Sequence, residues 1–106
     1  MLSFSKVKIK EEFIEAVNKG MPELFLPYVL APEVSFGDLE PNDGYEYFRD
    51  FLSSLKEESP ETLLCRIKDI SETKQELSFY DYKHKHPRLT VYVTFGDKLV
   101  FDIMPF

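Results

Sequence analysis

The sequence predicts a single α+β domain over residues 1–106, in which helices lie across a curved antiparallel sheet. Two observations predict this fold. Residues 44–55 carry apolar side chains at spacings of three and four, the pattern of an amphipathic helix. From residue 62 to residue 106, apolar and polar residues alternate, which is the pattern of half-buried strands. These strands offer a large apolar surface, so we expect the helix to cover it.

Two helices are expected before the amphipathic segment. In the first, which we expect to begin near Lys6, Phe13 and Val17 have helical spacing. Residues 18–20 end in a glycine, the residue that suits a helix C-terminus. The second helix is short and has Pro22 in its first turn. Its expected buried side consists of Leu24, Phe25, Tyr28 and Val29.

A short strand and a turn connect these helices to the central one. Residues 34–36 alternate as a strand does, and residues 37–44 are dense in turn-forming residues. Asn42 or Asp43 is expected to cap the central helix by accepting a hydrogen bond from its free N–H groups. The side chains expected to face the sheet are Phe48, Phe51, Leu52 and Leu55.

Four strands are expected in the second half, and their short connections predict an antiparallel meander. We expect the connections at residues 71–74, 84–88 and 96–97, the last as a two-residue hairpin turn. The expected inward-facing residues are Leu63, Cys65, Ile67, Leu77, Phe79, Leu89, Val91, Val93, Phe95, Leu99, Phe101 and Ile103.

Charge and composition exclude several function classes. The net charge of −6 disfavours nucleic acid and anionic membranes as partners. No apolar run approaches the ~18 residues of a membrane span. The residues around Lys6 do not resemble a signal peptide. The single cysteine, Cys65, has no internal partner and is expected to be a buried core thiol. These features predict a cytoplasmic protein.

The order of the predicted elements resembles the nuclear transport factor two-like superfamily, which includes ketosteroid isomerases, scytalone dehydratase and SnoaL-type cyclases. Three segments carry the resemblance: residues 13–20 are similar to the first helix of the family, residues 44–51 to its central helix and residues 96–103 to its closing hairpin. The resemblance implies a cone, in which the N-terminal helices pack in the concave face of a strongly bent antiparallel sheet and leave a cavity for small apolar ligands. It also implies a dimer formed through the outer sheet face. It implies no single function, since the fold hosts enzymes, binding proteins and assembly domains.

In the isomerases of this superfamily, an aspartate abstracts a proton while a tyrosine and a second acid hydrogen-bond the developing oxyanion. The resemblance places Asp38, just after the short strand, at the position of the base. The position of the tyrosine corresponds to Phe13, which has no donor, so the candidate helpers are Tyr28 and either Asp102 or Asp81. A carboxylate in such a turn is more often solvated or a local cap, so the catalytic role is an alternative.

A ligand, if one binds, is expected inside the cone, and no cofactor is expected. Large rings favour a filled interior, so the expected cavity is small and apolar. The residues expected to line it are Phe13, Phe36, Phe48, Phe51, Phe79, Val93 and Phe101.

Two surface features remain. His84 and His86 have the spacing of some metal ligands, but a third ligand is not evident, so we expect no metal site. The two histidines lie in a basic segment, residues 83–88, which is more suited to binding an acidic partner or a second subunit. Tyr80, Tyr82 and Tyr92 are expected on the outer sheet face, where aromatic residues favour a homodimer interface, although strand propensity alone also explains them.

The leading hypothesis is therefore a dimeric, non-catalytic protein that binds a small apolar ligand or has a structural role. The alternatives are an isomerase, dehydratase or cyclase that uses Asp38 as its general base, and an assembly module whose sheet face docks on another protein.

Overall fold

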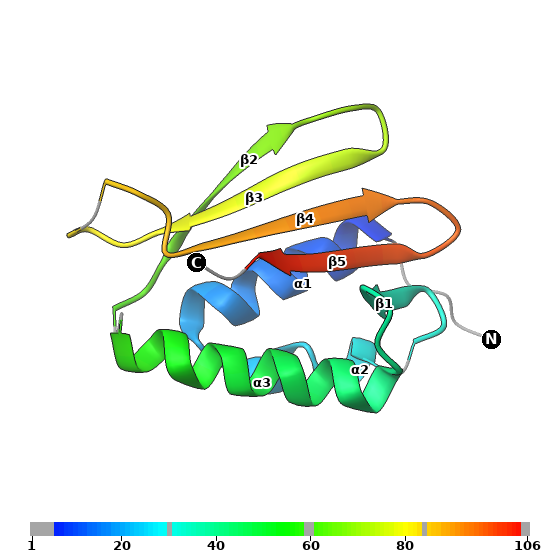
Figure 1. The fold of residues 1–106 in the computed structure, drawn as a ribbon, viewed down its shortest axis with the longest axis horizontal. Coiled ribbons are helices and arrows are strands. Elements are labelled where there is room, and N and C mark those ends of the chain that lie inside the picture. Colours follow the sequence, from blue (N-terminus) through cyan, green and yellow to red (C-terminus); the bar gives the residue numbers. More distant parts are fainter. Residues whose placement is uncertain (1–5, 30, 59–60, 84, 105–106) are drawn as a thin grey trace.

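The computed structural model describes residues 6–29, 31–58, 61–83 and 85–104, which form an α+β fold (Figure 1). The order of elements agrees with the prediction, including the short strand before the central helix. The elements are α1 (Lys6–Lys19), the 3-10 turn η1 (Pro22–Leu24), α2 (Leu26–Val29), β1 (Val34–Phe36), α3 (Pro41–Glu58), β2 (Leu64–Asp69), β3 (Lys74–Tyr80), β4 (Leu89–Phe95) and β5 (Leu99–Met104).

The strands form one mixed sheet in the order β1-β5-β4-β3-β2. Strands β2 to β5 form the predicted antiparallel meander. The prediction of a purely antiparallel sheet is wrong at the other edge, where β1 lies parallel to β5 with Val34 opposite Leu99. A long connection does not force two strands to pair antiparallel, and the chain between β1 and β5 contains α3 and the strands β2, β3 and β4. The turn before β5 has three residues rather than two, because Phe95 pairs with Leu99.

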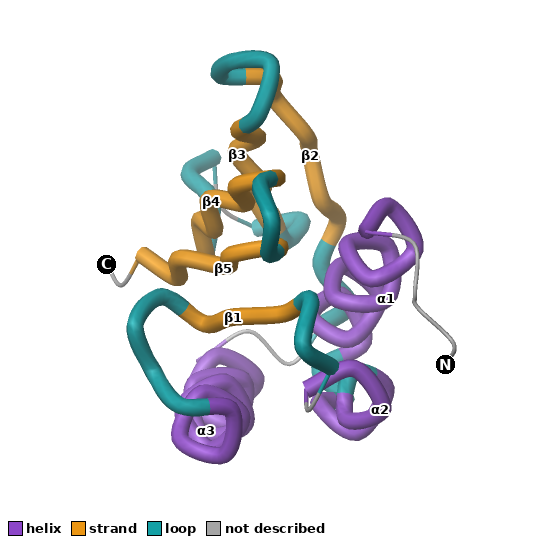
Figure 2. Tube along the Cα trace, turned by 90° about the vertical axis from the view of Figure 1, so that its right-hand side faces the viewer, coloured by secondary structure: helices purple, strands orange, loops and turns teal. Residues whose placement is uncertain are grey.

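Two different helices cover the sheet, and their arrangement corrects the prediction. Figure 2 shows α1 beside the inner face of the sheet, and α3 below β1 and next to α2. The side chain of Lys10 on α1 reaches across this face, where its Nζ donates to Gln75 Oε1 at 3.1 Å. The hollow that was expected to receive the central helix is therefore crossed by α1, while α3 packs against β1, η1 and α2.

Five phenylalanine rings meet where the helices and the sheet converge. The Phe13 ring stacks on Phe101 at 4.3 Å and on Phe48 at 5.1 Å between centroids, and Phe25 meets it edge-on at 5.4 Å. Phe36 on β1 stacks on Phe48 at 5.7 Å. All five rings are buried. The core therefore joins every layer of the fold through aromatic contacts.

Glycine residues fix how two helices end and approach their neighbours. Gly20 has φ +65°, as predicted for the glycine that ends α1, and Met21 N–H donates to Ala16 O at 2.9 Å, which forms a Schellman motif. Gly44 lies in α3 against β1, and a Cβ added there would be 2.8 Å from Phe36 Cδ2. The close contact between α3 and β1 therefore depends on glycine at position 44.

The predicted start of the central helix is wrong. Asn42 and Asp43 lie inside the first turn of α3, which begins at Pro41, so neither residue is the cap. Gly44 N–H donates to Glu40 O at 2.8 Å, which makes Glu40 the residue before the helix. A proline suits the first helical position because its fixed φ matches the helix and its missing N–H would have no partner there.

Several side chains are less buried than predicted, among them Leu24, Phe95 and Ile103, which are half-buried. Ile67 is 49% exposed, since β2 is an edge strand that the helices do not cover along its length. Phe51 is half-buried beside Tyr47, with 6.2 Å between the ring centroids. Cys65 is half-buried rather than part of the core. Burial still raises the pKa of its thiol to about 11, opposed by the charge of Lys10.

Candidate functional site

A groove of about 310 Å³ opens on the surface at the β1–β5 edge of the sheet, between the loop after β1, the helix α3 and the strand β5. It combines apolar surface with two carboxylates. Leu39 and Tyr47 are 45% and 41% exposed, although both are large apolar or aromatic residues. The lining residues are Phe36, Gly37, Asp38, Leu39, Tyr47, Phe101, Asp102 and Ile103.

The loop after β1 is held against β5 by backbone hydrogen bonds. Gly37 N–H donates to Phe101 O at 3.1 Å, which extends the pairing of β1 with β5 by one residue. Leu39 N–H then donates to Phe36 O at 3.0 Å and closes a tight turn. This turn places Asp38 in an exposed position at the groove. The groove wall is therefore part of the hydrogen-bonded sheet edge.

Asp102 belongs to a polar row on the outer sheet face. It lies directly opposite Tyr92 on β4, and Tyr92 lies opposite Glu76 on β3. Tyr92 Oη donates to Glu76 Oε2 at 3.1 Å, and this hydrogen bond, with the charge of Glu76, raises the pKa of Tyr92. Carboxylates in such a row accept hydrogen bonds from a cationic or hydroxyl-bearing ligand.

The structure brings together two of the three predicted catalytic residues. Asp38 and Asp102 line the same groove. Tyr28 lies elsewhere, buried with its ring 5.8 Å from that of Phe25. Sequence reasoning missed Tyr47, which supplies a phenol to the groove from α3. Its spacing of four from Phe51 was the available signal, because it places an aromatic pair beside the buried face of the helix.

The residues predicted to line a ligand cavity divide into three groups. Phe36 and Phe101 adjoin the groove. Phe51 is half-buried on α3. The remaining four, which are all buried with exposed fractions of 1% or less, are Phe13, Phe48, Phe79 and Val93. The ring contacts of Phe13 and Phe48 fill the region where the sequence analysis expected an apolar ligand.

The chain matches no protein-family model and no curated protein sequence. Within the described ranges, no group of three or more His, Cys, Asp and Glu side chains is placed to hold a metal ion. Among those same residues, no helix has the length and apolar character needed to cross a bilayer.

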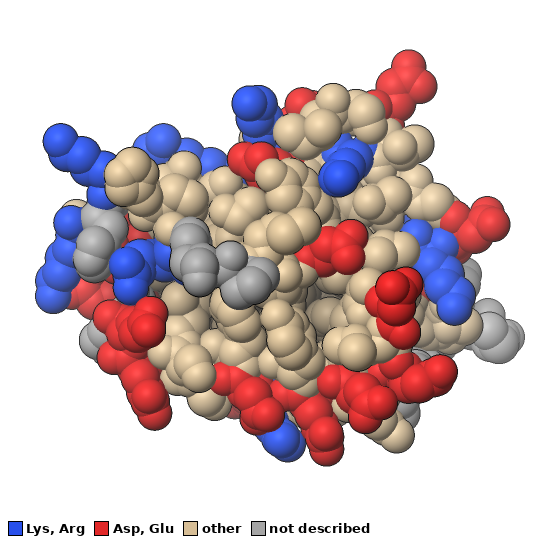
Figure 3. Space-filling view, viewed as in Figure 1, with Lys and Arg blue, Asp and Glu red and all other residues tan. Residues whose placement is uncertain are grey.

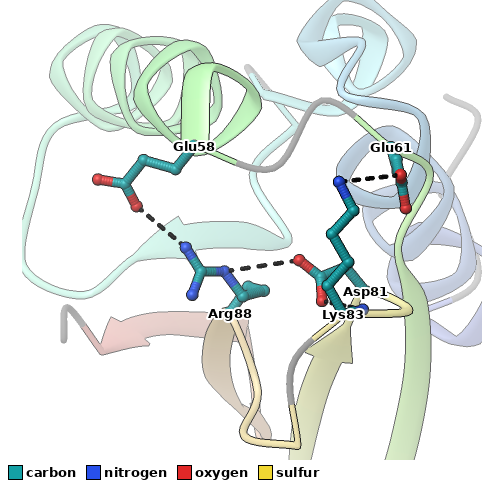
Figure 4. Close-up of polar contacts among 5 residues, drawn as sticks. All are labelled: Glu58, Glu61, Asp81, Lys83 and Arg88. Atoms are coloured by element: carbon teal, nitrogen blue, oxygen red, sulfur yellow. Dashed lines mark hydrogen bonds and ion pairs between the residues drawn. The ribbon is translucent and has the colours of Figure 1, made fainter.

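The basic segment before β4 contacts acidic residues of its own chain (Figure 4). Arg88 lies 3.5 Å from Glu58 at the end of α3 and 3.8 Å from Asp81, whose side chain is 4% exposed. Lys83 lies 3.6 Å from Glu61. The acidic groups expected to bind this segment are therefore supplied in part by the same chain: Glu58 at the end of α3, Glu61 before β2 and Asp81 after β3. Of the two histidines with metal-ligand spacing, His84 and His86, the first lies outside the described residues.

The three tyrosines predicted on the outer face do not lie together on it. Tyr80 ends β3, with the Arg66 guanidinium 5.0 Å from its ring centroid, and Tyr92 lies in the polar row. Tyr82 is 79% exposed and follows the end of β3, so its assignment to the sheet face is wrong. Strand periodicity does not extend past the last paired residue.

Proposed function

We propose that this protein is a non-catalytic binding protein of the nuclear transport factor two-like class, and that the groove at the β1–β5 edge holds a small molecule with an apolar body and a cationic end. The observation that carries the proposal is that Asp38 and Asp102 line one groove together with Leu39, Tyr47 and Ile103. A volume of about 310 Å³ suits a single small ring system with a short side chain.

The surrounding charge favours a cationic ligand. Figure 3 shows acidic side chains along the lower margin of the molecule, over α3, next to uncharged surface. This helix carries five exposed acidic residues and two basic ones, and the whole chain has a net charge of −6. Such a field raises the local concentration of cations and opposes anions. The exposed acidic residues are Asp43, Glu46, Asp50, Glu57 and Glu58.

The proposal is tested by titrating phenethylamine into the labelled protein and following its backbone amide shifts. We expect shifts at Gly37, Leu39 and Tyr47, and none with phenylacetate, which has a similar body and the opposite charge. Asp102→Asn keeps the size of the side chain and removes its charge, so it should weaken binding by about tenfold. Glu57→Gln is the matched control, since it removes an exposed charge of α3 outside the groove lining.

Three outcomes would contradict the proposal: no shift around the groove at millimolar phenethylamine, equal shifts with phenylacetate, or unchanged affinity in the Asp102→Asn variant. Equal losses in Asp102→Asn and Glu57→Gln would indicate that the general acidity of the surface, rather than the groove, attracts the amine.

A second candidate function is proton abstraction next to a carbonyl, because Asp38 and Asp102 share the groove with the Tyr47 phenol. In this alternative, Asp38 takes the proton from carbon and the Tyr47 hydroxyl donates to the developing enolate oxygen. Exchange of the α-protons of phenylacetone for deuterium, followed by NMR, tests it. Asp38→Asn should abolish the exchange, and exchange no faster than in buffer would exclude this reaction.

We further propose that the protein is a cytoplasmic homodimer that pairs through the outer sheet face. The support is that Thr90, Tyr92, Thr94 and Val100 are all partly exposed there rather than fully solvated. Aromatic residues such as Tyr92 are enriched at subunit interfaces relative to the rest of the surface. A monomer by light scattering at micromolar concentration would contradict the dimer.

A further inference from the structure

The strand β2 is an open edge of the sheet, since β3 is its only partner in the described part of the chain. Figure 1 shows it at the upper margin of the sheet. The other edge strand, β1, has three residues and is packed against α3. The strand β2 has six residues, which is long enough for another strand to pair with it.

Alternate residues of β2 direct their backbone groups away from β3. Ile70 N–H donates to Lys74 O at 2.9 Å, so the even-numbered residues are those that exchange hydrogen bonds with β3. The N–H and C=O groups of Cys65, Ile67 and Asp69 therefore face the open edge. Within the described residues, no acceptor lies within hydrogen-bond distance of the N–H groups of Cys65, Ile67 and Asp69.

The open edge begins at Cys65 because α1 covers the residues before it. Leu63 N–H donates to Asn18 O at the end of α1, at 3.1 Å. Leu63 points its N–H in the same direction as Cys65 and Ile67, because residues two apart in a strand share their orientation. The helix thus occupies the position that an added strand would take at Leu63, and leaves the following donors open.

The middle of this edge presents the apolar Ile67 on its inner face and two cations on its outer face, whereas at the two ends Asp69 lies on the inner face and Leu64 on the outer face. Ile67, on the inner face opposite Leu77, is 49% exposed. Arg66 and Lys68 are exposed on the outer face, and the Arg66 guanidinium is held 5.0 Å from the ring centroid of Tyr80. An added strand continues both faces of a sheet. A strand that pairs favourably with this edge therefore has apolar residues beside Ile67 and acidic residues beside Arg66 and Lys68.

We propose that the free edge of β2 binds an extended segment of another protein in which acidic and apolar residues alternate. The backbone groups of Cys65, Ile67 and Asp69 provide the hydrogen bonds, while Arg66 and Lys68 select for acidic side chains. The site is separate from the groove, which lies at the opposite edge of the sheet between β5 and α3.

Charge disfavours a second copy of β2 as the occupant. In an antiparallel pair related by a two-fold axis, residues on the same face meet. The two registers that overlap most of the strand are centred on Arg66 and on Ile67. They place Arg66 opposite Arg66 or opposite Lys68 of the second copy, and like charges directly opposite each other are destabilising.

The test uses a fluorescein-labelled, C-terminally amidated hexapeptide of alternating glutamate and valine, with binding followed by fluorescence anisotropy. The control peptide has lysine in place of glutamate. We expect binding of the glutamate peptide only, weakened by added salt. The double variant Arg66→Glu with Lys68→Glu should weaken binding of the glutamate peptide by at least about tenfold and strengthen binding of the lysine peptide.

Ile67→Pro tests the backbone hydrogen bonds. Proline removes an N–H that faces the open edge and leaves the ladder with β3 intact, so the variant is expected to fold. It should abolish binding, whereas Ile67→Thr, which retains the N–H, should change affinity by less than about threefold. The folded state of each variant is checked by circular dichroism.

Hydrogen exchange in the wild-type protein gives a measurement that needs no substitution. Addition of the glutamate peptide should slow exchange at the amides of Cys65, Ile67 and Asp69, without slowing those at Gly37 and Leu39 in the groove. The proposal is overturned by equal binding of both peptides, by full binding to Ile67→Pro, or by unchanged exchange at the three edge amides. Each result is independent of whether the groove binds an amine.

Discussion

Replacing Phe13 with alanine tests whether the aromatic cluster is a filled core. The Phe13 side chain is fully buried and its ring lies within 4.3 to 6.5 Å of four other rings, those of Phe25, Phe36, Phe48 and Phe101. These neighbours come from different elements held by the sheet, so the site cannot collapse easily. We therefore expect Phe13→Ala to lower the free energy of unfolding by about 3–5 kcal/mol.

A loss of this size is large for a domain of this length, whose stability is typically about 5–15 kcal/mol. At about 4 °C per kcal/mol, the unfolding temperature should fall by roughly 12–20 °C. Urea unfolding at equilibrium, followed by circular dichroism, measures the change directly. Phe13→Leu should cost less, because it removes less of the ring volume and leaves a smaller cavity.

The matched control is Val7→Ala on the same helix, where Val7 is 53% exposed. Its effect should be within about 0.5 kcal/mol. If Phe13→Ala changed stability as little as the control does, the ring would line open space rather than fill it. In that case the interior of the fold, and not the groove at the β1–β5 edge, would be the place to look for a ligand.

Two further predictions concern the end of α1 and the cysteine. Gly20→Ala should destabilise the protein by about 1–2 kcal/mol, because alanine is strained at φ +65°. The control Gly96→Ala should leave stability unchanged, because the atom nearest to an added Cβ is 3.8 Å away. Equal unfolding temperatures for the two variants would contradict this prediction. Alkylation of Cys65 at pH 8 should be about 100-fold slower in the folded protein than in urea. Burial raises the thiol pKa from 9.0 to about 11, which lowers the fraction of thiolate at pH 8 by that factor. Equal alkylation rates in the folded and unfolded protein would refute this prediction.

Local patterns predicted most of the secondary structure. The spacing of Phe48, Leu52 and Leu55 identified the buried side of α3, and the alternation of Val91 and Val93 identified the inward face of β4. These predictions were correct because helical and strand periodicity depend on neighbouring residues only. The terminal glycine of α1 was identified for the same reason, since its backbone conformation is set within one turn.

Pairing between distant segments could not be predicted in this way. The parallel contact of β1 with β5 joins Val34 to Leu99 across most of the chain, and it is this contact that brings Asp38 to Asp102. The exposure of Ile67 also depends on long-range order, because alternation marks the inward face of a strand but not whether a helix covers it.

Residue type and local spacing were sufficient to predict the α+β class, the order of the elements and a core rich in phenylalanine. Each of these depends on residue type and on spacing along a few turns or a short strand. The structure was needed to show that α1 rather than α3 crosses the inner face, that the two carboxylates share a groove at the β1–β5 edge, and that β2 leaves an open edge. These features arise from the packing of segments far apart in the chain, which no local pattern encodes.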